Sequence, residues 1–89
     1  MIERQLVVSN RLGLHARATA RLVQLLSGYK CSATLIAKGR EVNAKSIMGV
    51  MLLAAGPGTP VTLRVDGEDE AAAAEAVAEL FERRFDEES

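Results

Sequence analysis

The sequence has few of the residues that form metal sites, disulfides or aromatic cores. Its 89 residues include one cysteine, one histidine, no tryptophan and only three aromatic side chains. A single cysteine excludes an internal disulfide and is typical of a cytoplasmic protein. One cysteine with one histidine argues against a structural zinc site, which needs four ligands. We therefore expect no metal and an aliphatic core built from Leu, Val, Ile, Ala and Met.

The chain also lacks long apolar runs and extra length. No stretch reaches the ~18 apolar residues that a membrane-spanning helix needs, so we expect no membrane partner. The first residues, MIERQLVV, lack the pattern of a signal peptide. A chain of this length is expected to form one domain, over residues 1–89. That leaves no room for a catalytic domain together with a cofactor domain, and we expect no cofactor.

Charge is unevenly divided along the chain, although the net charge is only −1. Residues 1–45 contain eight Lys or Arg and two Asp or Glu, whereas residues 46–89 contain three and ten. Such a division can create one basic face that attracts a phosphate or an acidic partner. It is equally compatible with charges scattered over a solvated surface.

Hydrophobic periodicity predicts seven elements in the order β-α-β-β-α-β-α. Apolar residues alternate with period two near residues 2–8 and 60–67, and a hairpin is expected over 31–43 with its turn at Lys38-Gly39. Helical patterns begin at residue 16, cover part of 44–58 and fill 68–85, with a solvated tail at 86–89. We expect an α+β open-faced sandwich with a four-stranded antiparallel sheet and three helices on one face.

The two long helices have predicted buried faces. The stripe on the first comprises Ala16, Ala20, Leu22, Val23, Leu25 and Leu26. The stripe on the last comprises Ala73, Val77, Leu80 and Phe81. Arg83 and Arg84 are expected in the final turn of the last helix, where positive charge suits the helix dipole.

His15, in the stretch GLHAR, stands where the first helix begins. A helix N-terminus presents unpaired N–H groups and partial positive charge, and so attracts anions. A neutral imidazole has one free ring nitrogen, which can act as a nucleophile. Arg17 follows two residues later and can bind phosphate oxygens. The segment suits capture of a phosphoryl group on nitrogen, although a plain surface histidine that caps the helix remains open.

Ser46 stands at the start of the short second helix. It can be a plain N-cap, which contributes ~1 kcal/mol. It can also be a phosphorylation site, since the helix dipole and Lys45 would stabilise a phosphate there. The following residues Ile47, Met48 and Met51 are expected to leave an exposed apolar patch that suits several docking partners, although part of this segment can be ordinary core.

GLHAR, followed about thirty residues later by AKSIMGVM, resembles the HPr family of histidine-containing phosphocarrier proteins of the bacterial phosphotransferase system. The resemblance covers nearly the whole chain, and the two motifs together are highly specific. It implies a phosphocarrier that is not an enzyme, with His15 as the phosphoryl acceptor at Nδ1 and Arg17 as the group that stabilises the phosphoryl oxygens.

The resemblance also implies partners and regulation. The phosphoryl donor would be Enzyme I, which is itself phosphorylated by phosphoenolpyruvate. The acceptors would be Enzyme II A domains or their nitrogen-branch equivalents. HPr kinase/phosphorylase would phosphorylate Ser46. Ile47, Met48 and Met51 match the family's docking patch, with Arg21 and Lys45 on the surrounding basic surface. We expect a monomer.

Two features depart from a simple match. Ala18 stands where the family usually has proline, which suits a first helical turn but donates no N–H. The tail ELFERRFDEE resembles the nitrogen-related paralogue, whereas AKSIMGVM resembles HPr under kinase control. The chain can therefore serve sugar uptake or a regulatory phosphotransfer chain.

Three other classes of protein compete with this interpretation. A ferredoxin-like or KH-like nucleic-acid module would use the basic half, but a GxxG clamp loop and stacking aromatics in the strands are missing. A paralogue modified only on serine would be expected to lack the active histidine. A stand-alone enzyme would need carboxylates clustered near the histidine or a cofactor motif.

Overall fold

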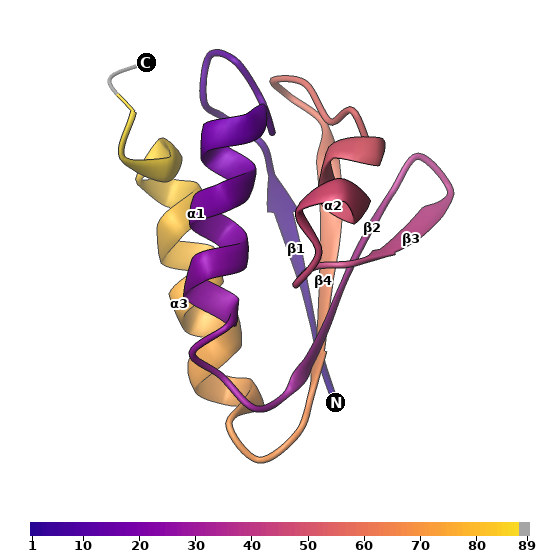
Figure 1. Cartoon of the computed structure of the whole chain (residues 1–89), viewed down its shortest axis with the longest axis vertical. Coiled ribbons are helices and arrows are strands. Elements are labelled where there is room, and N and C mark those ends of the chain that lie inside the picture. The colour runs from indigo at the N-terminus through magenta and orange to yellow at the C-terminus, as the bar shows by residue number, and fades with distance from the viewer. Residues whose placement is uncertain (88–89) are drawn as a thin grey trace.

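The elements are arranged as the hydrophobic pattern predicts. A computed structural model describes residues 1–87 of the chain, and its element order is β-α-β-β-α-β-α with a short 3₁₀ helix at the end. The α+β open-faced sandwich is confirmed (Figure 1). The elements are β1 (Ile2–Val7), α1 (Ala16–Leu26), β2 (Ser32–Ala37), β3 (Arg40–Asn43), α2 (Ile47–Leu52), β4 (Pro60–Asp66), α3 (Glu70–Glu82) and η1 (Arg84–Asp86).

The four strands form one antiparallel sheet in the order β1-β4-β2-β3. Its inner face buries aliphatic side chains such as Leu35 and Leu63 beneath the helices. Its outer face is mostly polar, and Arg64 on β4 pairs with Glu3 on β1 at 3.0 Å and with Glu41 on β3 at 3.1 Å. This face needs no covering layer, so all three helices pack on the other face, with α1 beside α3 (Figure 1).

The β2–β3 hairpin turns at the predicted residues. Lys38 and Gly39 both have positive φ, 53° and 77°, as a two-residue turn of type I′ requires. At the other end of β3, Asn43 Oδ1 accepts a hydrogen bond from the Lys45 backbone N–H at 2.9 Å. This contact turns the chain out of the sheet and toward α2.

The predicted buried face of α1 is partly wrong. Ala16 and Ala20 are exposed, whereas Ala18 and Thr19 are completely buried, with Leu22 and Leu26. Thr19 tolerates burial because its hydroxyl donates to the Leu14 carbonyl at 3.2 Å. The prediction used apolar residues alone and excluded this threonine as polar. The predicted buried face was therefore displaced around the helix toward the two exposed alanines.

The end of α3 also differs from the prediction. The helix ends at Glu82, and Arg84, Phe85 and Asp86 adopt left-handed backbone angles with φ of 54°, 57° and 61°. Arg83 is thus the C-cap, and neither arginine lies in the last helical turn. The left-handed turn directs Phe85 into the core, where its ring centroid lies 4.8 Å from that of Phe81. The core is therefore not purely aliphatic, since Phe85 is one of its largest fully buried side chains.

Gly13 is the point where the loop before α1 packs closely against the loop after α2. Its φ is +69°, and a Cβ placed there would lie 2.6 Å from the Ala55 carbonyl oxygen and 2.8 Å from Gly56 Cα. The next residue, Leu14, donates its backbone N–H to that same Ala55 carbonyl at 2.9 Å. Only glycine satisfies both the backbone angle and the close approach.

We predict that Gly13→Ala lowers the free energy of unfolding by about 1–3 kcal/mol, because the added methyl group strains the backbone and separates the two loops. Denaturant titration measures this change. Gly56→Ala is the matched control, since no atom lies within 4 Å of its added Cβ. Equal stabilities of the two variants would contradict the packing described here.

Candidate functional site

His15 is the residue that begins α1. It is the N-cap, with an extended backbone (φ −77°, ψ −178°), and its carbonyl accepts the Thr19 N–H at 2.9 Å. Its ring nitrogen Nδ1 accepts a hydrogen bond from the Arg17 backbone N–H at 3.3 Å. The accepting nitrogen must carry a lone pair, so the ring proton belongs to Nε2. The helix start thus places an unprotonated Nδ1 beside free backbone N–H groups.

The other ring nitrogen contacts the C-terminal segment. His15 Nε2 lies 2.5 Å from Glu87 Oε2, and the two side chains are 27% and 14% exposed. The prediction of a solvated tail over 86–89 is therefore wrong for Glu87, while residues 88 and 89 lie outside the described residues. The burial of Phe85 is the physical reason, because it draws the following residues back toward the start of α1.

Asn10 holds Glu87 in place. This side chain is completely buried, and its Nδ2 donates to Glu87 Oε1 and to the Gly13 carbonyl, both at 2.8 Å. The hydrogen bond from Asn10 lowers the pKa of the Glu87 carboxyl. The contact with His15 and the charge of Arg21 lower this pKa further, whereas burial of the carboxyl raises it. Neither Asn10 nor Glu87 was identified as a site residue from the sequence. The one signal in the sequence was the apolar Phe85 within the charged tail, which indicates that this segment packs against the core.

The two arginines of α1 differ in their surroundings. Arg17 is exposed and makes no ion pair within residues 1–87, so its guanidinium is free to meet an incoming anion. Arg21 is half-buried and donates through Nη1 to the Phe85 carbonyl. Arg21 therefore secures the C-terminal segment, and only part of its charge faces solvent.

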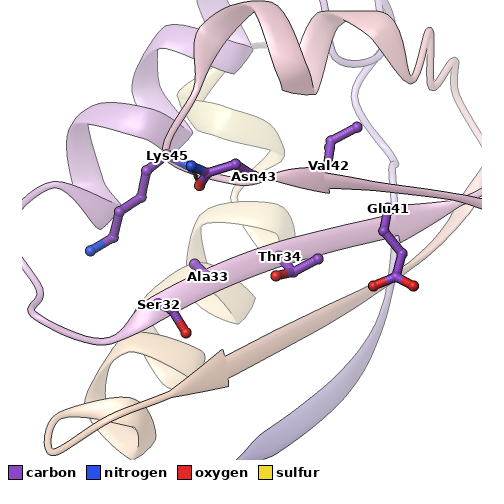
Figure 2. Close-up of a pocket in the computed structure, with 7 residues that line it drawn as sticks. All are labelled: Ser32, Ala33, Thr34, Glu41, Val42, Asn43 and Lys45. Carbon is purple, nitrogen blue, oxygen red and sulfur yellow. Dashed lines mark hydrogen bonds between the residues drawn. The ribbon is translucent and has the colours of Figure 1, made fainter.

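Ser46 is the N-cap of α2. Its Oγ accepts the Gly49 N–H at 3.1 Å, and the side chain is half-buried. Lys45 does not direct its ammonium group to this hydroxyl, because its Nζ donates to the Tyr29 carbonyl at 2.7 Å. Figure 2 shows the Lys45 side chain extending from the turn after β3 toward the chain that leads into β2. The expectation that Lys45 stabilises a phosphate on Ser46 has no support in this arrangement.

The exposed apolar side chains of α2 form what we call the α2 patch. Its members are Ile47 (46% exposed), Met48 (77%), Met51 (43%) and Leu52 (64%). Sequence reasoning omitted Leu52, and also Leu12, an exposed leucine in the loop before α1. Val50 alone of the α2 residues is buried. A short helix with one buried residue offers most of its apolar surface to other molecules.

A groove of about 420 Å³ lies along the β2–β3 hairpin, lined by Ser32, Ala33, Thr34, Glu41, Val42, Asn43 and Lys45 (Figure 2). Within residues 1–87, no three His, Cys, Asp or Glu side chains gather as a metal site would require. Nor does any helix in this part of the chain have the length and apolar character to span a membrane.

An accessible imidazole on a helix N-terminus, next to a free guanidinium and an apolar patch, defines a class: small proteins that carry a phosphoryl group on histidine between partners. The family model described as "PTS HPr component phosphorylation site" matches residues 2–83. The phosphocarrier protein HPr of Xylella fastidiosa is 62% identical, with both chains covered completely. That of Cupriavidus necator is 49% identical over 98% of each chain.

The solved structures agree with the sequences. The crystal structure of HPr-C-His from Thermoanaerobacter tengcongensis superposes with a TM-score of 0.96 at 39% identity, over the whole of both chains. The chain belongs to the HPr family of phosphocarrier proteins of the phosphotransferase system. It is a phosphocarrier and not an enzyme, and family membership implies Enzyme I and Enzyme II A partners.

We predict that Glu87 contributes to stability only where its carboxyl is ionised. Its pKa is depressed below the ordinary 4.5 in the folded protein, so this contribution is present above that value and is lost as the pH falls through the lower folded pKa. Glu87→Gln resembles the protonated side chain. The difference in free energy of unfolding between wild type and Glu87→Gln should thus shrink as the pH falls below the ordinary 4.5 and through the depressed folded pKa.

Denaturant titrations across this pH range measure the difference. Glu82→Gln is the control, because Glu82 is an exposed carboxylate at the end of α3 with no ion pair among the described residues. A difference for Glu87→Gln that stays constant with pH would contradict the assigned contacts.

Proposed function

We propose that His15 accepts a phosphoryl group at Nδ1 from phospho-Enzyme I and passes it to Enzyme II A domains or their nitrogen-branch equivalents. One observation carries this proposal: Nδ1 accepts the Arg17 N–H and therefore has the lone pair that attack on phosphorus requires. The bond is long, 3.3 Å, so its replacement costs little. Once Nδ1 turns to phosphorus, the Arg17 N–H is free to bind a phosphoryl oxygen.

Transfer then depends on positioning and charge. The Nδ1 lone pair attacks phosphorus in line while the bond to the donor breaks, and the free guanidinium of Arg17 stabilises the charged oxygens. The α2 patch and the partner's surface exclude water from the shared interface. The P–N bond remains reactive, so the group moves onward when an acceptor replaces the donor.

The α2 patch is the proposed docking surface for both kinds of partner. Ile47, Met48 and Met51 supply adaptable apolar contacts, and Arg21 and Lys45 add positive charge to the surrounding surface. Their backbone contacts limit that role, because the Arg21 guanidinium and the Lys45 ammonium are each held by a carbonyl.

Ser46 is the proposed site of regulatory phosphorylation by HPr kinase/phosphorylase. A phosphate on Ser46 would add up to about two negative charges directly before the α2 patch. Added charge at a docking surface weakens association with partners selected for the unmodified surface. The hydroxyl already serves as the helix cap, so its modification need not alter the fold elsewhere.

The remaining expectations complete the proposal. The protein acts as a single domain over residues 1–89, as a monomer, without nucleic acid, in the cytoplasm that is typical of the family. The 62% identical relative is named HPr, whereas the tail ELFERRFDEE resembles the nitrogen-related paralogue, so the chain can serve either branch.

We predict that incubation with phosphoenolpyruvate and Enzyme I adds one acid-labile phosphate to the wild type and none to His15→Ala. Intact-mass spectrometry measures both. Arg17→Ala should slow phosphorylation about 100-fold, the usual cost of removing one donor to a developing charge. Arg11→Ala, which removes an exposed arginine from the preceding loop, is the matched control. Phosphate on His15→Ala would refute the assignment.

We predict that Ser46→Asp weakens the productive interaction with Enzyme I severalfold, seen as a higher KM for the carrier with an unchanged kcat. Ser46→Asn is the matched control, since Asn and Asp both cap helices well but only Asp is charged. Circular dichroism and thermal unfolding verify that both variants fold. Equal transfer kinetics for Asp and Asn would show that charge at this position has no regulatory effect.

A further inference from the structure

The C-terminal segment has a role that the proposed function does not yet use. Three segments far apart in the sequence meet at the start of α1: the loop that contains Asn10, His15 itself, and the turn that ends in Glu87. Figure 1 shows η1 at the same end of the molecule as the start of α1. The meeting point is specified by side chains, since Phe85 is fully buried and Arg21 binds its carbonyl.

The two ring nitrogens of His15 have opposite hydrogen-bonding roles. Nδ1 accepts from a backbone N–H, which cannot itself accept a hydrogen bond. Nε2 faces a carboxylate oxygen at 2.5 Å, which accepts hydrogen bonds. Both contacts are satisfied only when the proton resides on Nε2 and donates to Glu87. A short bond of this kind to an ionised acceptor is stronger than one between neutral groups.

Glu87 is itself restrained. Its Oε1 accepts from Asn10 Nδ2, and Asn10 cannot move freely because it is fully buried and also donates to the Gly13 carbonyl. The carboxylate is thus bound at one oxygen by a buried amide and at the other by the imidazole. A side chain held at both oxygens orients its partner far better than a solvated one.

We propose that Glu87 is a positioning residue for phosphoryl transfer: it holds the His15 ring and keeps the proton on Nε2, so that Nδ1 is the attacking atom. This inference rests on the proposed role of His15. When Nδ1 forms its bond to phosphorus and the donor's bond to phosphorus breaks, the ring becomes positively charged while the Nε2 proton stays in place. The Glu87 carboxylate lies against that proton and stabilises the charge. When the group moves on, the electrons of the P–N bond return to Nδ1, and the ring leaves neutral with the same proton.

The position of Glu87 is compatible with the reaction. A carboxylate close to Nδ1 would repel the phosphoryl group, but Glu87 contacts the ring at the nitrogen that does not react. Arg21, whose charge acts on Glu87, holds the adjacent Phe85 carbonyl. The arrangement leaves Nδ1, Arg17 and the α2 patch to the partner.

The test compares Glu87→Ala with Asp86→Asn. The control removes a charge from the neighbouring residue, which pairs with Arg83, and Asn tolerates the left-handed backbone there. Nuclear magnetic resonance of the single, ¹⁵N-labelled histidine reports which ring nitrogen carries the proton and whether that proton is protected from exchange. Phosphoryl transfer from phospho-Enzyme I, quenched at successive times, gives the rate of transfer, and denaturant titration verifies folding.

We expect a protected, strongly downfield Nε2 proton in the wild type and in Asp86→Asn. In Glu87→Ala this signal should disappear and transfer should slow roughly tenfold, of the size that follows loss of a group orienting a functional histidine. Loss of the signal with an unchanged rate would overturn the positioning role and leave a purely structural contact. A ring proton on Nδ1 in the wild type would also overturn it. If the wild type shows the Nε2 signal but accepts no phosphate, the proposed function fails, and the contact is again only structural.

Discussion

The close approach of Gly13 to the loop at residues 55 and 56 is the contact on which the functional surface depends. It joins the loop before α1 to the loop after α2, with the Leu14 N–H donating to the Ala55 carbonyl. The start of α1, which includes His15, is therefore held against the loop that follows α2. The proposed function needs this arrangement, because a partner would have to bind the α2 patch and reach the imidazole in one encounter.

The imidazole of His15 is partly exposed, and the proposed chemistry follows from that exposure. An enzyme encloses its substrate and excludes water itself, whereas the groove along the β2–β3 hairpin has no lining residue from the start of α1. In the proposed mechanism, the docked partner encloses His15 and excludes water. The chain itself would contribute the same groups to both encounters: the unprotonated ring nitrogen of His15, the N–H groups of the helix start, and the Arg17 guanidinium. The proposed catalysis is thus divided between two proteins.

Local signals in the sequence sufficed for most of the fold. The Lys38-Gly39 turn, the caps at His15 and Ser46, and the alternation in β4 each depend on residues within a few positions of one another. The failures involve contacts between distant residues. The burial of Thr19 depends on a carbonyl acceptor, and the burial of Asn10 depends on Glu87, 77 positions away. Periodicity cannot register such contacts, because each of these residues is polar and would by itself favour the surface.

The location of Glu87 also explains how a half-buried histidine at a helix start can be held in one orientation. At the helix start, only Nδ1 is restrained by the backbone, and a single long bond leaves the ring able to rotate. A second restraint at Nε2 limits rotation without covering Nδ1. The Glu87 side chain provides this restraint, and the burial of Phe85 brings its segment to the ring.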